Sequence, residues 1–276
     1  RPLRMKEDCR LSWAIIPTAG RGTRLRPATN VIPKVLLPVG LRPMIDWAID
    51  EALEADVEEI AFVVSPDQPM VKAHIKARQS SSDWPVGVEA HFVEQPNPAG
   101  LGDALIRCRP WTGDDSFGVV VPDNWFDSSR APVAQLAGAH FRTGEASLGL
   151  IEVRPGQGFL LGNVGEVELE AMKNQDFRIM RLGDKSEGAF VNRQSRSVLR
   201  GCARYVLGPG FYDALEATGP FPEGEWDDVP AFQHLADRAA LIGHKLDGHH
   251  FDLGHQNGYL AAMNYLFERD VIGNGA

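Results

Sequence analysis

Short continuous runs of apolar residues recur along the first half of the chain, as expected for strands that are buried on both faces. The runs are Trp13–Pro17, Ile60–Val64, Val88–Val93 and Phe117–Val121. Between them lie segments with apolar residues at helical spacing, namely the segment after Pro43, Val71–Ala77 and Leu101–Cys108. Strands that alternate with helices predict an α/β fold, in which a parallel sheet carries helices on both faces.

The pattern changes after about Phe141, where extended segments follow one another more closely. Strands are predicted at Ser147–Val153, Val164–Leu169, Arg204–Leu207 and His250–Leu253, and helices at Pro209–Glu216 and Asn257–Phe267. Because these mixed strands continue from the parallel half, we expect one Rossmann-like, mixed and mostly parallel sheet. A β-rich lobe that binds a sugar or another substrate would enlarge it.

Composition excludes several classes of protein. The chain is 43% hydrophobic and 24% charged, as in ordinary globular proteins, and no apolar run approaches the roughly 18 residues of a membrane span. A net charge of -9 without a basic stripe argues against a nucleic-acid partner. Segment 1–10 lacks the apolar core of a secretory signal. Three distant cysteines, Cys9, Cys108 and Cys202, have no metal spacing and favour the cytoplasm.

One segment departs from this acidic balance. No Asp or Glu occurs from Leu11 to Ile45, whereas cations recur there. The cations are Arg21, Arg24, Arg26, Lys34 and Arg42. A local group of cations in an acidic chain indicates one bound anion rather than affinity for polyanions in general. Because the group follows the apolar run Trp13–Pro17, it predicts a phosphate site at the end of a strand.

A glycine-rich turn, Ala19-Gly20-Arg21-Gly22-Thr23-Arg24, opens this segment. Glycines at positions 20 and 22 have no Cβ, so backbone N–H groups can approach phosphate oxygens closely. Leu25 stands where a dinucleotide-binding motif needs a third glycine, and the Gly-Lys-Ser/Thr of a P-loop is absent. Glycine spacing alone fits a plain strand-to-helix turn equally well, and the charge asymmetry favours the phosphate site.

The turn is part of a longer pattern. Gly20-x-Gly22-Thr23-Arg24 continues into Pro27-x-Thr29 and then into Pro33-Lys34-x-Leu36-Leu37-Pro38. This pattern resembles the signature of the sugar-1-phosphate nucleotidyltransferases, in particular the bacterial glucose-1-phosphate uridylyl- and thymidylyltransferases. The form Pro27-Ala28-Thr29 with Ile32-Pro33-Lys34 is closer to the uridylyl branch. The resemblance extends from Trp13 to about Phe267.

The resemblance implies an enzyme that transfers a nucleotidyl group from UTP or dTTP to a hexose 1-phosphate, with glucose 1-phosphate expected, and releases pyrophosphate. Ala19, Gly20, Gly22 and Thr23 would hold the triphosphate, Arg24 its leaving phosphates, and Lys34 the reacting phosphates. Cations there would offset the repulsion between two anions. The segment Glu94–Ala104, taken by itself, predicts only a polar turn before a helix. By the resemblance, Gln95 and Gly100 in this segment would contact the pyrimidine base. An amide suits the imide edge that uracil and thymine share.

Two aspartates match the metal ligands of the family. Asp123 follows the strand Phe117–Val121, and ligands of open α/β sheets bind at the carboxyl ends of strands. Asp252 lies in the segment His250–Gly254. Two carboxylates together with triphosphate oxygens suit Mg²⁺, the expected cofactor. A zinc site remains an alternative, although no further Cys or acid completes a tetrahedral set. Its ligands would be His249, His250, Asp252 and His255.

The sugar side is the more divergent half. Its implied residues are Gly162, Asp184, Lys185 and Asp228. By the resemblance, Lys185 would bind the sugar phosphate and act in catalysis together with Arg24 and Lys34. Asp184-Lys185-Ser186 replaces the family's Glu-Lys-Pro, and Ala203 stands where glycine is common. The segment Glu225–Pro230 departs from a typical Glu-Ile-x-Leu-Thr-Asp run. These departures leave the choice of sugar open.

The resemblance also predicts how the chain is organised. Segment 1–10 would be an N-terminal extension and 11–276 a single domain, with a nucleotide-binding half (11–140) and a sugar-binding half (141–276). The expected partners are a nucleoside triphosphate and a sugar 1-phosphate, with neither nucleic acid nor membrane, and a homo-oligomer stays open. A non-catalytic regulatory protein that binds nucleotide sugars is the alternative. Two cations and two acids that match the family argue against this alternative, because a protein that only binds nucleotide sugars has no need of all four. These residues are Arg24, Lys34, Asp123 and Asp252.

Overall fold

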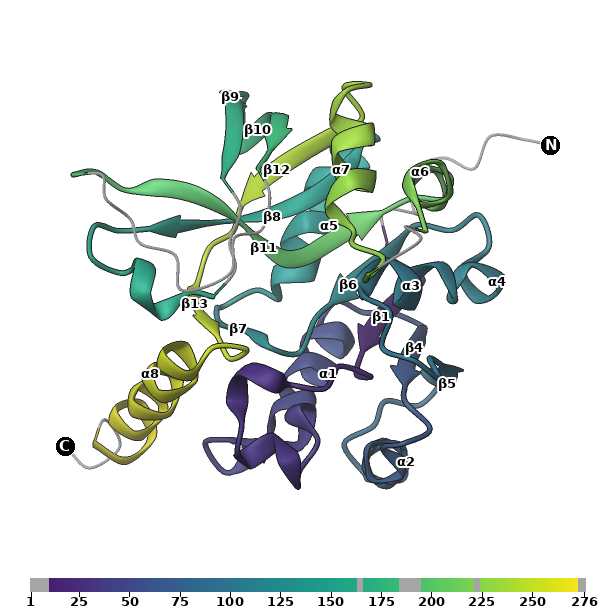
Figure 1. Cartoon of the computed structure of the whole chain (residues 1–276), viewed down its shortest axis with the longest axis vertical. Coiled ribbons are helices and arrows are strands. Elements are labelled where there is room, and N and C mark those ends of the chain that lie inside the picture. Colours follow the sequence, from purple (N-terminus) through teal and green to yellow (C-terminus); the bar gives the residue numbers. More distant parts are fainter. Residues whose placement is uncertain (1–9, 163–165, 184–194, 221–223, 273–276) are drawn as a thin grey trace.

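The computed structural model describes residues 10–162, 166–183, 195–220 and 224–272. A nine-stranded sheet runs through it in the order β5-β4-β1-β6-β11-β8-β12-β10-β9 (Figure 1). The strands are β1 (Trp13–Pro17), β4 (Glu59–Val64), β5 (Glu89–Glu94), β6 (Phe117–Val120), β8 (Ala146–Val153), β9 (Val167–Ala171), β10 (Asp176–Leu182), β11 (Val198–Leu207) and β12 (Leu241–Lys245). Only β10 and β11 run against the other strands of this sheet. The mixed, mostly parallel sheet confirms the predicted fold class.

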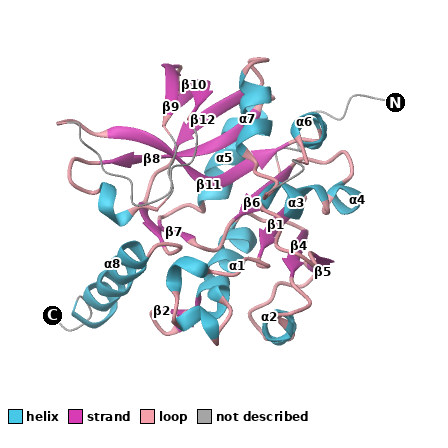
Figure 2. Ribbon diagram, viewed as in Figure 1, coloured by secondary structure: helices cyan, strands magenta, loops and turns pink. Residues whose placement is uncertain are grey.

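Helices cover both faces of the sheet (Figure 2). One layer consists of α1 (Met44–Glu54), α2 (Pro69–Gln79) and α5 (Pro132–Thr143). The other consists of α3 (Leu101–Ile106), α6 (Gly210–Thr218) and α7 (Val229–Ala236), with the short α4 (Arg109–Thr112) following α3. Side chains of a strand alternate between two faces, so Ala14 and Ile16 of β1 pack in the first layer's core and Trp13 and Ile15 in the second.

A smaller unit lies beside the main sheet. The strands β7 (Asn124–Asp127) and β13 (His249–Asp252) pair in antiparallel fashion, and α8 (Gln256–Phe267) packs against them. α8 also contacts the short strand β2 (Pro38–Val39), which pairs with β3 (Arg42–Pro43). An apolar core that includes Met44, Trp125, Phe251 and Leu266 joins these pieces. The C-terminal segment therefore supports the loops that follow β1.

The remaining short helical segments lie in connections. They are η1 (Thr23–Leu25), η2 (Ala28–Asn30), η3 (Lys34–Leu36), η4 (Gly158–Leu160) and the π-helical turn η5 (Glu268–Ile272). No helix in the described part of the chain has the length and apolar character to cross a membrane.

The four apolar runs of the first half are strands whose bounds lie within one residue of the predicted ones. In the second half, β11 begins six residues before Arg204, and β10, β12 and α7 were not predicted. Nor was α5, which ends the first half. β10 is largely half-buried or exposed and carries two arginines, so its apolar pattern is weak. The predicted strand at Val164 begins only at Val167, and Val164 itself lies outside the described residues.

Candidate active site

The loops that follow β1, β5 and β6 meet at one edge of the sheet, because these strands are parallel and end on the same side. They enclose a cavity of about 520 Å³. All the residues predicted for the nucleotide line it, namely Ala19, Gly20, Gly22, Thr23, Arg24, Lys34, Gln95 and Gly100. Asp123 and Glu225 line it as well. The structure thus brings together residues that are spread over two hundred positions of the sequence.

The glycine turn is shaped for close approach. Gly22 has φ +64°, a conformation that favours glycine, and a Cβ there would lie 2.7 Å from the Cβ of Lys34. The Thr29 hydroxyl donates a hydrogen bond of 2.8 Å to the Gly22 carbonyl. At the start of the turn, the Thr18 hydroxyl and N–H both donate to the Val63 carbonyl at the end of β4. Gly22 therefore lets Lys34 pack directly against the turn.

Asp123 and Asp252 come together through the small sheet, in which Asp252 pairs with Asn124. A Cβ on Gly254 would lie 2.6 Å from Asp123 Oδ2 and 3.2 Å from Asp252 Oδ1, so both carboxylates face this glycine. Asp252 accepts hydrogen bonds from the N–H groups of Gly162 (2.7 Å) and Gly254 (3.0 Å). The Gly162 N–H, predicted to contact the sugar, thus orients an aspartate in this structure.

The two carboxylates differ in their electrostatics. Burial by itself raises the pKa of Asp123, but the Lys34 ammonium, which contacts its Oδ2, outweighs burial and lowers the pKa below its ordinary value. Burial and the nearby charge of Asp123 raise the pKa of Asp252. Two neighbouring carboxylates repel each other when both are charged, so a bound cation would stabilise this pair.

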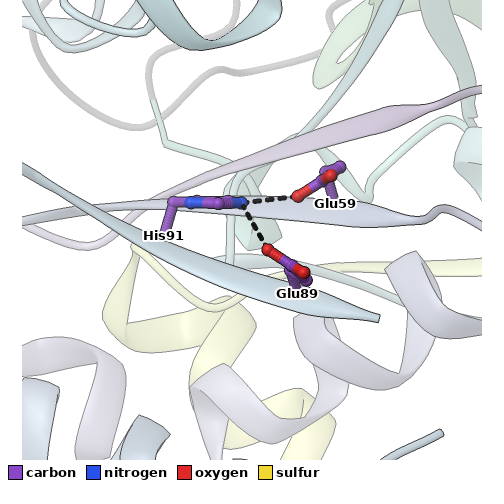
Figure 3. A group of neighbouring side chains, drawn as sticks. All are labelled: Glu59, Glu89 and His91. Carbon is purple, nitrogen blue, oxygen red and sulfur yellow. Dashed lines mark hydrogen bonds and ion pairs between the residues drawn. The ribbon is translucent and has the colours of Figure 1, made fainter. Parts of the chain in front are cut away.

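One other possible metal site lies away from the cavity. Among the described residues, one group of three offers ligand atoms close together, Glu59, Glu89 and His91 (Figure 3). It lies toward the amino ends of β4 and β5, at the opposite edge of the sheet from the cavity. His91 Nε2 is 2.5 Å from Glu59, so a hydrogen bond between them accounts for the contact. The four residues of the zinc alternative form no such group in the described part of the chain.

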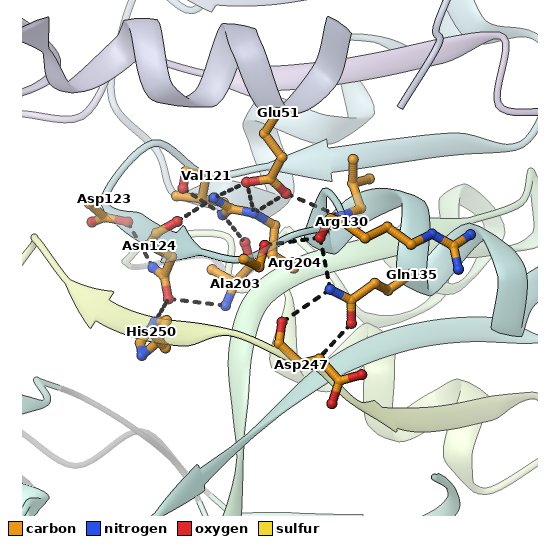
Figure 4. Close-up of polar contacts among 12 residues, drawn as sticks. Glu51, Val121, Asp123, Asn124, Arg130, Gln135, Ala203, Arg204, Asp247 and His250 are labelled. Carbon is orange, nitrogen blue, oxygen red and sulfur yellow. Dashed lines mark hydrogen bonds and ion pairs between the residues drawn. The ribbon is translucent and has the colours of Figure 1, made fainter. Parts of the chain in front are cut away.

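A buried charged pair supports the loop that carries Asp123 (Figure 4). Arg204 on β11 is 1% exposed, and its Nε and Nη2 donate to the carboxylate of Glu51 on α1 at 2.8–3.0 Å. Its Nη1 donates to the Val121 carbonyl at 2.7 Å, and its Nη2 contacts the Asn124 carbonyl. One guanidinium thus binds the backbone on both sides of Asp123.

Asn124 extends this network toward the second aspartate. Its Nδ2 donates to Asp123 Oδ1 at 3.0 Å, so its Oδ1 is the acceptor for His250 Nε2 at 3.0 Å. Burial and the Arg204 charge lower the pKa of His250 to about 3. The imidazole is therefore neutral near pH 7 and donates a proton from Nε2 to the amide.

A second cavity of about 260 Å³ adjoins the first, and Arg24 and Asp123 line both. Asp252, Tyr205 and Asp228 also line it. Asp228, predicted for the sugar, is 1% exposed and accepts a hydrogen bond of 2.9 Å from the Tyr205 hydroxyl.

This tyrosine keeps its proton, because burial and the charge of Asp228 raise the pKa of Tyr205 well above its ordinary value. The predicted sugar ligands Asp184 and Lys185 lie outside the described residues. Of the residues predicted for the sugar, the structure therefore describes Gly162 and Asp228.

Several residues around the site were not predicted. Glu51 lies on the buried face of a predicted helix, and Arg204 is the first residue of a predicted strand and lies within the longer β11. A charged residue within each of two buried elements is a sequence signal for a buried pair, but nothing in the sequence says which charges meet. Arg42, another cation of the segment without acids, forms an ion pair with Asp50 at 2.6 Å and is not among the residues that line the cavity.

Comparisons with known proteins agree with this geometry. The family described as Nucleotidyl transferase matches residues 13–268. The UTP–glucose-1-phosphate uridylyltransferase of Pseudomonas aeruginosa is 29% identical over 92% of this chain and 95% of its own length. The enzyme of that name from Escherichia coli K12 is 27% identical over 91% of this chain and 90% of its own.

Solved structures show the same fold. A UDP-glucose pyrophosphorylase complexed with UDP-glucose superposes with a TM-score of 0.79 at 24% identity, covering 94% of this chain and 99% of that one. A UTP-bound UGPase from Acinetobacter baumannii gives a TM-score of 0.75 at 25% identity, with 96% of each chain covered.

Proposed function

The chain belongs to the nucleotidyl transferase family, and on that premise we propose that it transfers the uridylyl group of UTP to glucose 1-phosphate. In this reaction a phosphate oxygen of the sugar phosphate attacks the α-phosphorus of UTP. The bond from that phosphorus to the oxygen of the β-phosphate breaks, and pyrophosphate leaves with the electron pair. The names of the relatives from P. aeruginosa and E. coli support this choice of substrates.

The observation that carries the proposal is the meeting of the two cavities at Arg24 and Asp123, with Lys34 beside them. One cavity has room for a nucleotide and the other, half its volume, for a sugar phosphate. A reacting phosphate at their junction would lie next to two cations, Arg24 and Lys34. The attacking phosphate is already ionised, so positioning and charge stabilisation suffice, and no side-chain nucleophile is required.

Asp123 and Asp252 are the residues that would hold Mg²⁺, since both carboxylates face Gly254 at the same junction. Oxygen ligands of this kind fit the ion's preference. Bound Mg²⁺ would supply positive charge to the triphosphate and the leaving pyrophosphate. Without it, the Lys34 ammonium compensates the charge of Asp123, and the N–H groups of Gly162 and Gly254 hold Asp252 in place.

A matrix assay of pyrophosphate release tests the proposal. It crosses UTP, dTTP, CTP, ATP and GTP with several sugar 1-phosphates, with and without Mg²⁺. We expect turnover with UTP and glucose 1-phosphate that requires Mg²⁺. Tight binding of UDP-glucose with no turnover in any cell of the matrix would support the non-catalytic alternative instead.

Lys34→Ala should lower kcat/KM by about a thousandfold, because the charge on the reacting phosphates loses its nearest cation. Lys173→Ala, at an exposed turn far along the chain, is the matched control and should behave as the parent protein. Thermal unfolding of both variants shows whether the loss of activity comes from impaired catalysis or from impaired folding. Near-normal activity of Lys34→Ala would contradict the assignment of this cavity as the active site.

A further inference from the structure

Gln95 has a fixed orientation in the wall of the larger cavity. It follows β5, is 4% exposed, and its backbone N–H donates to the Val64 carbonyl at 2.9 Å. Its side-chain Nε2 donates to the Gly100 carbonyl at 3.1 Å and to Asp103 Oδ2 at 2.8 Å. A carbonyl and a carboxylate can only accept, so the nitrogen of the amide must face them. Both protons of the amide are then used.

Asp103 is itself held in place. It lies on α3, is 8% exposed, and receives a second hydrogen bond of 2.8 Å on the same Oδ2 from Arg107 Nε. An oxygen that accepts from two N–H donors acts as an acceptor at this position. The carboxylate of Asp103 therefore presents an acceptor to Gln95 and opposes any rotation that would turn the amide oxygen toward it.

The Gly100 carbonyl is equally constrained. Gly100 has φ +101°, and a Cβ there would lie 2.5 Å from the Trp226 carbonyl oxygen. The Trp226 backbone donates to the Ala99 carbonyl at 2.6 Å and accepts from the Gly102 N–H at 2.8 Å. This clamp on both sides of Gly100 keeps its carbonyl directed at the Gln95 amide.

We propose that Asp103 is a positioning residue that selects the base of the nucleotide through Gln95. With both amide protons committed, Oε1 is the polar atom that Gln95 has left for a ligand, and among the described residues none donates to it. An acceptor matches the ring N3–H of uracil or thymine. Cytosine presents an acceptor at N3, so it would meet Oε1 as an unpaired, repelling atom. This inference rests on the proposed function, and it assigns the selection to a residue outside the nucleotide-contacting loops.

The test compares kcat/KM for UTP and CTP, with glucose 1-phosphate, in the parent protein and in Asp103→Asn. The substitution replaces a charged acceptor by a neutral amide whose nitrogen can donate to Gln95 Oε1. The present orientation of the Gln95 amide therefore loses much of its preference over the turned one, which offers N–H to the base. We expect the UTP-to-CTP ratio to fall by about tenfold or more. Asp103→Ala, which frees the amide to rotate, should shift the ratio in the same direction.

Two controls separate selection from general damage. Asp114→Asn makes the same chemical change at an exposed site and should keep the ratio within about twofold of the parent. Lys173→Ala, at an exposed turn, is the second control and should also keep the ratio. A merely structural role of Asp103 would lower activity with both nucleotides alike.

Calorimetric titration with UTP and with CTP gives a readout that needs no turnover. A ratio of dissociation constants that falls in Asp103→Asn supports the proposal. An unchanged ratio in both Asp103 variants, with folding intact, overturns it. A parent protein that binds UTP in preference to CTP yet has no uridylyl transfer activity overturns the proposed function and leaves the role of Asp103 supported or refuted by the binding data alone.

Discussion

Gly254 is the residue on which the geometry of the two aspartates depends. Its φ lies outside the left-handed range, so the requirement for glycine is one of space. A Cβ would come within 2.6 Å of Asp123 Oδ2, a distance that real Cβ atoms do not reach. Any larger residue must therefore push one of the carboxylates away from its place beside the other.

Gly254→Ala should lower kcat/KM by about a hundredfold, because a displacement of the order of 1 Å at the reacting groups has effects of that size. Folding should be affected far less. Gly210→Ala is the matched control, since a Cβ at position 210 meets nothing within 4 Å. Measurements of kcat/KM and of melting temperature on the two variants check this. Equal activity of the two would show that the aspartates tolerate the displacement.

Individual site residues could be predicted from the sequence when they belonged to a motif with defined spacing. Gly22 and Lys34 are twelve positions apart in one motif, and they pack against each other. Asp103 lay in a segment that was singled out, but its contact with Gln95 depends on a turn closed by Trp226, far along the chain. Spacing predicts residues that one local structure brings together, and it does not predict contacts made by a distant segment.

At the scale of elements, α1 and β11 are joined by the Glu51–Arg204 pair rather than by apolar packing alone. The pair also binds the loop between β6 and β7. Breaking a buried ion pair leaves one charge without compensation, which costs far more than the pair contributes as a whole. The elements around the site therefore share one electrostatic support.

Arg204→Met should lower the free energy of unfolding by about 3 to 5 kcal/mol, because Glu51 would remain buried and charged. The double variant Glu51→Leu with Arg204→Met should recover a large part of that loss. Urea unfolding at pH 7 measures both. Lys245→Met, which breaks the exposed pair with Glu152, should cost less than about 1 kcal/mol. A double variant as unstable as Arg204→Met would contradict this account of the pair.

The elements differed in how far the sequence could predict them. Strands β1, β4 and β6 are almost wholly buried, so continuous apolar runs revealed them. Strands β9 and β10 lie at the end of the sheet, and their mixture of exposed and half-buried positions has no clear period. Periodicity reports burial, and it is weakest where an element is buried least.

At the scale of the whole molecule, the smaller cavity lies where the parallel strands of the first half join β11 and β8 of the second, and the larger cavity adjoins it. The sheet is continuous across this junction, which constrains the two halves to one arrangement. The division at residue 140 stays a prediction about function, since the sheet itself shows no break there. Global stability should accordingly respond to buried groups in either half.

The stability of the whole molecule should fall between pH 7 and pH 5. Burial lowers the pKa of His140, whose Nδ1 donates to the Glu145 carbonyl and whose Nε2 accepts from Ser116. Below the ordinary value of about 6.5, the unfolded chain therefore binds a proton that the folded chain does not. Each such group contributes a slope of up to about 1.4 kcal/mol per pH unit.

Urea unfolding of the parent protein and of His140→Gln at pH 8, 6.5 and 5 measures this contribution. At pH 8 both residues are neutral, so the difference there isolates the lost hydrogen bonds. Toward pH 5 the variant should lose stability less steeply than the parent. Parallel pH dependences would show that His140 is protonated equally in the folded and unfolded states.

The place of β11 in the sheet has a consequence for how the protein is made. β11 lies between β6 and β8, and its Arg204 is 153 residues beyond Glu51. At translation rates of about 5 to 20 residues per second, Glu51 emerges on the order of 10 s before its partner. Until β11 has been synthesised, one edge of β6 has no strand to pair with, and Glu51 has no Arg204 to bind its carboxylate. Synthesis of the second half is therefore a step in the folding of the first.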